Sequence, residues 1–273
     1  MSSEPASTAV QTPTSYFLHF SVSARHMKLH LLGTAGYHPT EHRHTACLML
    51  PEQGIVLDAG TAMFRVRKHL ATPQLDIYLT HAHLDHVTGL TYLFDVLADK
   101  PMERVTIHAL PDKLAAIDQH LLNEQIFPVK LPYEMRPLVQ DAPLTDGGTL
   151  RYFPLSHPGG SIGLRLNWPE HSLAYVTDTN TPGACASYID AIRGVDVLVH
   201  ECYYPDGLEK TAQLTGHSCA TPVAQAAKAA RVGRLLLTHL NPLREEEDPI
   251  GLRKILDIFP EAEIARDGME VEF

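Results

Sequence analysis

The segment from Thr80 to Leu90 constrains this chain more than any other part of its sequence. It reads THAHLDHVTGL and follows an apolar stretch of strand length. Four potential metal ligands stand there within six residues: His81, His83, Asp85 and His86. A strand that ends in a tight loop can direct alternate side chains at one point, and imidazole with carboxylate is a ligand set that zinc, manganese and iron accept. A polar loop whose histidines only face water is the plain alternative, but this spacing favours a metal site.

Apolar runs of strand length alternate with segments of helical period along the chain, which predicts an α/β architecture. We expect strands at residues 28–32, 46–50, 55–58, 76–80, 105–109, 151–155, 162–166, 172–177, 195–200 and 234–238. We expect helices at residues 61–70, 86–97, 111–121, 183–193, 221–230 and 249–258. Thr221 before Pro222 and Asp248 before Pro249 pair a capping side chain with proline and so predict two helix starts. The stretch 131–148, which contains proline and glycine, is predicted to be a loop.

The 273 residues suit one large domain. Residues 1–26 are rich in Ser, Thr and Pro, so we expect a disordered extension there and a folded domain over residues 27–273. No apolar run is long enough to cross a bilayer.

Charge and cysteine usage restrict the partners and the compartment. Acidic residues outnumber basic ones by 32 to 22, so the formal net charge of -10 would repel a long nucleic acid unless basic groups gather at one site. The four cysteines are scattered without a CxxC pair: Cys47, Cys185, Cys202 and Cys219. They suggest neither a zinc knuckle nor a disulfide scaffold, and a reducing cytoplasm fits best.

The order His-x-His-x-Asp-His after a strand resembles the signature of the metallo-β-lactamase superfamily. Three later residues fill the places at which that family has further ligands: His157 in LSHPGG, Asp178 in YVTDT and His239 in LLLTHLNP. The resemblance covers nearly all of the chain from Met27 onward. It implies the αββα sandwich of that family, with two mixed β-sheets packed face to face and helices on both outer faces.

The resemblance also implies a centre of two divalent ions. One metal would be held by His81, His83 and His157, the other by Asp85, His86 and His239, and Asp178 would bridge them. Zinc is the expected metal, with manganese or iron as alternatives. Asp58, at the end of the run IVLDAG, matches a family aspartate that supports the metal loop without being a ligand, although a simple turn aspartate is an equal alternative.

The expected chemistry is hydrolysis by a hydroxide that bridges the two metals, because two close divalent ions lower the pKa of a shared water. The seven protein ligands carry only two negative charges against the four positive charges of two divalent ions, so the pocket would be electropositive. It should therefore favour a small anionic substrate.

Two further motifs resemble the ribonuclease Z branch of the family: LVHECYY, with His200 and Glu201, and TGHSCA, with His217. By that resemblance His217 would act on the reacting phosphate as an acid or hydrogen-bond donor, Glu201 would orient it, and Asp85 would complete the catalytic set. Alternatively, Glu201 could cap a helix and His217 could bond a loop carbonyl. Arg43 and His44 stand where that branch has a phosphate-contacting loop, but a surface charge cluster explains them equally well.

The substrate is expected to be a small phosphodiester, such as a cyclic nucleotide or a short oligonucleotide. Enzymes of this branch that process transfer RNA carry a long basic arm near the region between the ligands His157 and Asp178, and the segment 158–177 leaves no room for it. A glyoxalase-II-like thioesterase or lactonase shares the metal ligands and stays an alternative. A transfer-RNA 3′ endonuclease and a non-catalytic metal sensor are further ones. The resemblance also implies a homodimer.

Overall fold

The computed structural model describes Met1 and residues 26–130 and 133–273. The predicted disordered extension 1–26 therefore lies almost wholly outside the described residues. Two seven-stranded sheets form the centre of the fold. In sheet order, the first contains β14 (Met269–Glu272), β1 (Lys28–Gly33), β2 (Cys47–Leu50), β3 (Ile55–Leu57), β4 (Gln74–Tyr78), β5 (Arg104–Ala109) and β6 (Glu134–Pro137). The second contains β13 (Ala262–Ile264), β12 (Arg234–Thr238), β11 (Val197–Glu201), β10 (Ser172–Val176), β9 (Ser161–Asn167), β8 (Thr149–Leu155) and β7 (Ala142–Pro143).

Both sheets are mixed. In the first, β3 to β6 run parallel and β14, β1 and β2 pair antiparallel. In the second, β10 to β13 run parallel and β7 to β9 pair antiparallel. Parallel strands put their carboxyl ends at one edge of the sheet, where loops can assemble a site.

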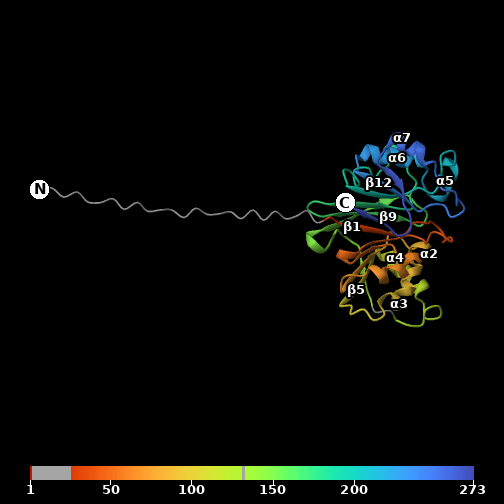
Figure 1. Cartoon of the computed structure of the whole chain (residues 1–273). Coiled ribbons are helices and arrows are strands. Elements are labelled where there is room, and N and C mark those ends of the chain that lie inside the picture. The colour runs from red at the N-terminus through yellow and green to blue at the C-terminus, as the bar shows by residue number, and fades with distance from the viewer. Residues whose placement is uncertain (2–25, 131–132) are drawn as a thin grey trace.

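Helices cover the outer face of each sheet (Figure 1). The α-helices are α1 (Val66–His69), α2 (Leu84–Val87), α3 (Leu93–Leu97), α4 (Pro111–Ala116), α5 (Glu209–Thr215), α6 (Ala220–Ala230) and α7 (Leu252–Ile258). Short 3₁₀ turns are η1 (Pro51–Gln53), η2 (Thr61–Arg65), η3 (Thr88–Tyr92), η5 (Thr145–Gly147) and η6 (Gly183–Cys185), and a π-helical turn is η4 (Ile117–Leu121). None of these helices, within the part of the chain that the structure describes, is long and apolar enough to cross a membrane.

Three apolar clusters hold the four layers together. The central one lies between the sheets and joins residues such as Leu31 and Leu57 of the first sheet to Leu164 and Leu236 of the second. The other two lie under α1 to α4 and under α6 and α7. The predicted αββα sandwich is confirmed.

All ten predicted strands are present, with their ends shifted by at most two residues. The prediction of a loop over 131–148 is wrong in part, because the short edge strands β6 and β7 lie within it. Strands β13 and β14 and helix α5 were not predicted.

The helix predictions are less accurate. The predicted helix 183–193 is wrong: only the turn η6 and further tight turns occur there, and Gly183 adopts a left-handed φ of 61°. Thr221 is not the N-cap of α6, which begins one residue earlier and receives its cap from Asp206, whose Oδ1 accepts the Thr221 N–H at 2.9 Å. Asp248 accepts the N–H groups of Gly251 and Leu252, but α7 begins only at Leu252.

Candidate metal centre

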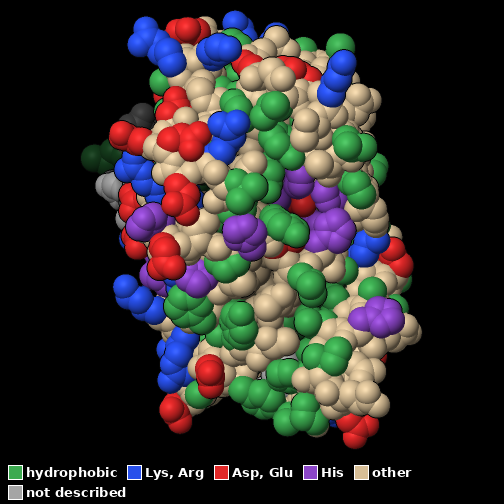
Figure 2. All heavy atoms as spheres, turned by 90° about the vertical axis from the view of Figure 1, so that its right-hand side faces the viewer, with side chains coloured by type: hydrophobic (Ala, Val, Ile, Leu, Met, Phe, Trp, Pro, Cys, Tyr) green, Lys and Arg blue, Asp and Glu red, His purple; other side chains and the backbone are tan. Residues whose placement is uncertain are grey.

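The seven predicted ligands meet at one edge of the sandwich, after the carboxyl ends of four strands. The loop and helix α2 after β4 carry four of them, and β8, β10 and β12 are each followed by one: His157, Asp178 and His239. Figure 2 shows histidine side chains gathered in a hollow of this face. Strands distant in sequence thus deliver their end residues to one place.

Three residues at strand ends have a left-handed backbone that turns their side chains inward. The φ angles are 57° at Asp58, 52° at Asp178 and 53° at His239. Such a conformation costs a non-glycine residue about 1 kcal/mol or more, so surrounding contacts must hold it. Gly36 makes room for His239, because a Cβ at Gly36 would lie 2.4 Å from His239 Nδ1.

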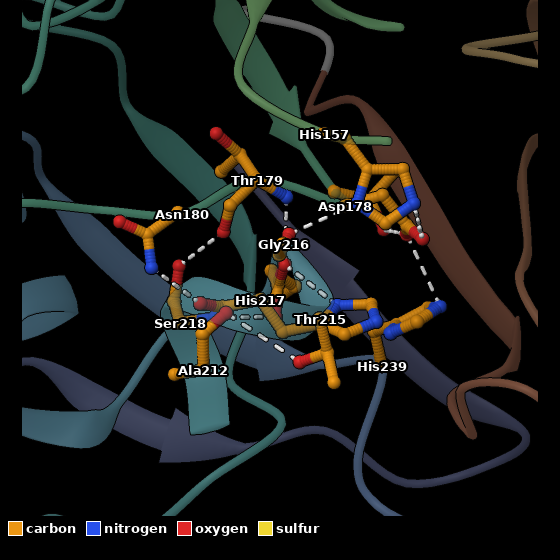
Figure 3. A network of polar contacts seen from close by, with 12 residues as sticks. His157, Asp178, Thr179, Asn180, Ala212, Thr215, Gly216, His217, Ser218 and His239 are labelled. Carbon is orange, nitrogen blue, oxygen red and sulfur yellow. Dashed lines mark hydrogen bonds and ion pairs between the residues drawn. The ribbon is translucent and has the colours of Figure 1, made fainter. Parts of the chain in front are cut away.

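Asp178 lies between two groups of ligand atoms, with one carboxylate oxygen toward each. Oδ2 lies 3.3 Å from His157 Nε2 and 3.5 Å from His81 Nε2. Oδ1 lies 3.2 Å from His86 Nε2 and 3.1 Å from His239 Nε2. Figure 3 shows His157 and His239 on the two sides of Asp178. This is the arrangement of a carboxylate that can bridge two cations.

The ligand atoms form two compact sets. The first comprises His81, His83, His157 and Asp178, and the second comprises Asp85, His86 and His239; within each set, the atoms lie within 4.8 Å of one another. Ligand atoms about 2.0–2.1 Å from a tetrahedral zinc are roughly 3.3 Å apart, which matches the observed separations. The residues present therefore fit divalent metals.

Hydrogen bonds at Nδ1 leave the Nε2 lone pairs of three histidines pointing into the centre. His157 Nδ1 donates to the Gly216 carbonyl at 2.9 Å, and His86 Nδ1 donates to Asp58 Oδ2 at 2.8 Å. His81 Nδ1 lies 3.0 Å from Thr80 Oγ1, while its buried Nε2 has no hydrogen-bond partner among the described residues. Such outer contacts fix the tautomer that binds metal. A cation between them can satisfy lone pairs that face one another and a carboxylate.

The ionisation of these groups shows that the centre attracts positive charge. Burial lowers the pKa of His81 well below its usual value, so the imidazole is neutral. Although burial opposes it, the neighbouring imidazoles of His239 and His86 hold the pKa of Asp178 well below its usual range. Burial also opposes a charge on His86, yet Asp178 and Asp85 raise its pKa well above the usual value. The negative potential at this point therefore stabilises a positive charge.

Asp58 organises the loop beneath the second set. It is fully buried, and Oδ1 accepts the Thr80 N–H at 2.8 Å while Oδ2 accepts from His86 Nδ1 and from the Tyr175 hydroxyl at 3.0 Å. A simple turn aspartate would not make these long-range contacts. The structure favours the role that the resemblance implied, in which Asp58 supports the metal-binding loop without being a ligand.

Buried Glu201 and partly buried His217 form a pair beside the centre. Glu201 Oε1 accepts the Thr179 N–H at 2.7 Å and lies 3.1 Å from His217 Nδ1, and Oε2 accepts the Ser218 N–H at 3.1 Å. His217 also lies with Asp178 and His239 in a third set of possible ligands. Burial alone lowers the pKa of His217, but the Glu201 carboxylate raises it to about 9. Glu201 thus holds the backbone N–H groups of two loop residues, Thr179 and Ser218, and it orients His217 as well.

Three other residues that the sequence singled out make different contacts. His200 points to the opposite side of its strand, where Nε2 lies 2.7 Å from the Tyr188 hydroxyl. Arg43 Nη1 donates to Thr34 Oγ1 and to the Ala265 carbonyl, both at 2.6 Å, and His44 Nδ1 lies 3.2 Å from Thr61 Oγ1. Arg43 and His44 are partly buried and take part in a network of hydrogen bonds, which differs from a free surface charge cluster.

Some contacts at the centre were not anticipated. The Tyr203 ring stacks on His217, with ring centroids 4.6 Å apart and planes at 16°. The Tyr37 N–H donates to Asp85 Oδ2 at 2.8 Å. Tyr203 follows the His-Glu pair and could have been noted as an aromatic residue beside it, whereas a backbone donor leaves no signal in the sequence.

Comparison with known proteins identifies the family. Residues 54–240 match the model of the beta-lactamase superfamily domain. The chain belongs to the beta-lactamase superfamily. It is a hydrolase of the metallo-β-lactamase kind, as the histidine motif predicted.

Individual relatives agree with this assignment. Ribonuclease Z of Gemmatimonas aurantiaca is 25% identical, over an alignment that covers 88% of this chain and 94% of that protein. The metallo-β-lactamase fold protein YhfI of Bacillus subtilis superimposes with a TM-score of 0.76 at 19% identity, covering 90% of this chain and 99% of that one. A diphosphatase from the PhnP family superimposes with a TM-score of 0.69 at 18% identity, covering 91% and 98%. The predicted similarity to ribonuclease Z is confirmed.

Proposed function

We propose that this protein is a metal-dependent phosphodiesterase that hydrolyses a small phosphodiester, such as a cyclic nucleotide or a short oligonucleotide. The observation that carries the proposal is the His217–Glu201 pair, which lies against the two ligand sets with Asp178 and His239. A thioester or lactone site does not need this pair, whereas a phosphodiester needs a group that can bond its oxygens or protonate its leaving group.

The residues of the centre are assigned to two divalent ions, with zinc as the expected metal. His81, His83 and His157 would hold one ion, Asp85, His86 and His239 the other, and Asp178 both. When bound, two such ions supply a hydroxide near neutral pH and neutralise charge that develops on the phosphoryl group. Asp85 would also form the outer side of the second metal position. Its carboxylate accepts a hydrogen bond from the Tyr37 N–H, which fixes its orientation.

His217 is assigned to the substrate. Its Nδ1 is held by Glu201, so the ring cannot turn, and Tyr203 stacks on one face. No hydrogen bond joins its Nε2 to a residue in the described part of the chain, so this nitrogen can donate to a phosphate oxygen or to the leaving group. In this position, His217 would raise the rate of phosphodiester hydrolysis about a hundredfold, as a positioned general acid does.

A small substrate is supported by the structure around Asp178. Strands β9 and β10 are joined by only residues 168–171, and no arm extends from the described segment 156–180. The net charge of -10 also opposes a polyanion. Cleavage of transfer RNA is the second candidate, because the chain aligns with 94% of a protein named ribonuclease Z.

Turnover of four substrates tests the proposal: a chromogenic phosphodiester, a thioester, a lactone and a precursor transfer RNA, each with and without a chelator. We expect hydrolysis of the phosphodiester that chelation abolishes and metal restores. Hydrolysis of the thioester or lactone alone would contradict the proposal. Cleavage of the precursor RNA with little turnover of small diesters would support the second candidate, and metal binding without any turnover would support a sensor.

A further inference from the structure

A second cluster of possible metal ligands lies on the first sheet and shares no residue with the metal centre. It consists of His30 on β1, Glu270 on β14 and His69, the last residue of α1. One ligand atom of each residue lies within 4.8 Å of the ligand atoms of the other two. Two strands and a helix thus bring two imidazoles and a carboxylate together.

The pairing of β1 with β14 sets two of the three side chains next to each other. His30 and Glu270 are direct partners in this antiparallel pair, so their side chains leave the sheet on the same face. Leu29 and Leu31 point into the layer between the sheets, so His30 points to the outer face, where α1 packs through Val66. A buried position that an apolar side chain usually fills is therefore occupied by an imidazole.

His69 completes the cluster from the end of the helix. Its ring centroid lies 4.5 Å from that of His30, with the ring planes at 57°. His30 Nδ1 lies 3.5 Å from Glu270 Oε1, which is long for a hydrogen bond and close to the roughly 3.3 Å between two ligand atoms of a tetrahedral zinc. No hydrogen bond joins either imidazole to another residue in the described part of the chain. These nitrogens are therefore available to a ligand.

The ionisation and the chemistry of the three groups favour a transition-metal ion. Burial lowers the pKa of His30, and burial and the neighbouring His30 lower the pKa of His69, so both rings are neutral near pH 7. A neutral imidazole can bind a metal without first losing a proton. Two nitrogens and one carboxylate oxygen suit zinc, copper and nickel, whereas magnesium and calcium take mostly oxygen ligands.

We infer that His30, His69 and Glu270 form a third metal site, which binds one zinc ion or a similar transition-metal ion outside the metal centre. Three protein ligands leave a position for water, and the Glu270 side chain is 58% exposed, so the ion can enter from solvent. The folded chain holds the three ligands together and the unfolded chain does not, so the bound ion stabilises the fold. It has no part in hydrolysis.

Binding at this third site should be weaker than at the metal centre. Only three side chains hold the ion, and the positive charges of Lys28 and Lys68 act on the two histidines and oppose a cation. We therefore expect the ion to leave during gel filtration. Its binding has to be measured at equilibrium.

Equilibrium dialysis against rising concentrations of free zinc tests the inference. The protein is first loaded with two zinc ions, and elemental analysis then counts the zinc per chain at each concentration. We expect the wild type to take up a third ion. His69→Ala and Glu270→Gln should each weaken this third step about tenfold or more, since the loss of even an outer partner of a metal ligand costs roughly 10–100-fold. Neither side chain is buried, so both variants should fold.

Glu272→Gln is the matched control, because Glu272 lies on the same strand and its carboxylate pairs with Lys28 Nζ at 3.6 Å. It should keep the third ion with unchanged affinity. A wild type that takes up only two ions would overturn the inference. So would a third ion that His69→Ala and Glu270→Gln bind as tightly as the wild type, or one that Glu272→Gln loses equally, because the binding would then depend on the general charge of this face. The zinc count is independent of turnover, so the proposed function is tested separately.

Discussion

The support that Asp58 gives to His86 leads to a specific prediction for Asp58→Asn. The buried carboxylate accepts the His86 Nδ1 proton at 2.8 Å, and this bond keeps the lone pair on Nε2, which faces the metal position. The amide of asparagine has almost the same shape and can keep an acceptor toward the Thr80 N–H. If its NH₂ group takes the place of Oδ2, His86 must accept at Nδ1 and carry its proton on Nε2, where it blocks the ligand atom.

The expected loss of zinc affinity follows from this single hydrogen bond between His86 and Asp58. A hydrogen bond to a charged partner contributes about 1.5–3 kcal/mol, and each 1.4 kcal/mol is a factor of ten in affinity. The metal position formed by Asp85, His86 and His239 should therefore bind zinc roughly 10–100-fold more weakly, as outer partners of metal-binding histidines generally do. The position formed by His81, His83 and His157 should keep its affinity within a few-fold.

Competition titration with a chromophoric chelator measures both affinities in one experiment. Asp76→Asn is the matched control, because Asp76 lies on the adjacent strand β4 and bonds Arg104 and His108 instead of the metal centre. It should bind two zinc ions with unchanged affinity. Two unchanged affinities in Asp58→Asn would refute the reasoning, and an equal loss at both positions would show that Asp58 acts by holding the whole loop.

Three further predictions concern catalysis, acid stability and packing. His217→Ala should keep its metal content by elemental analysis and lose about a hundredfold in phosphodiester turnover, and unchanged turnover would make His217 only structural. Burial opposes the charge on Asp76, but His108 and Arg104 lower its pKa from 3.8 to about 2. A carboxyl with a lowered pKa stabilises the fold above its unfolded value and loses this effect as the pH falls. The difference in unfolding free energy between the metal-free wild type and Asp76→Asn should thus be about 1–2 kcal/mol at pH 7, after solvent screening, and should shrink between pH 4 and 2; a constant difference would exclude this cause. Leu236→Ala, in the fully buried layer between the sheets, should lower the unfolding free energy by about 2–5 kcal/mol in denaturant titrations without changing metal content, and a smaller loss would mean that the layer repacks.

His81, His83, Asp85 and His86 could be predicted as ligands because they crowd together after a strand whose apolar run is visible in the sequence, whereas His157, Asp178 and His239 could be added only through the family resemblance. Asp178 and His239 come directly after such runs, and parallel strands bring their ends together. The His217–Glu201 contact could be anticipated only through family resemblance. Sixteen residues separate the two positions, and no periodicity requires them to touch.

Other features could not be predicted, for physical reasons. The apolar residues of 183–193 have a helical spacing, and Ile189 and Ile192 are buried as a helix would bury them. The chain instead packs these residues through successive turns that follow Gly183, which has a left-handed backbone. Edge strands β6 and β7 have few apolar residues and gain their order from pairing with β5 and β8. The contact of Tyr37 with Asp85 uses a backbone N–H, which every residue other than proline possesses.

The central claim is that seven side chains bind two metal ions that share Asp178. Elemental analysis of zinc-loaded protein after gel filtration tests it most directly, with the wild type and Asp178→Ala measured side by side. We predict two zinc ions per chain in the wild type and loss of both in Asp178→Ala, because a bridging carboxylate belongs to each position. A wild-type protein that retains no zinc, or an Asp178→Ala protein that still holds two ions, would contradict the account.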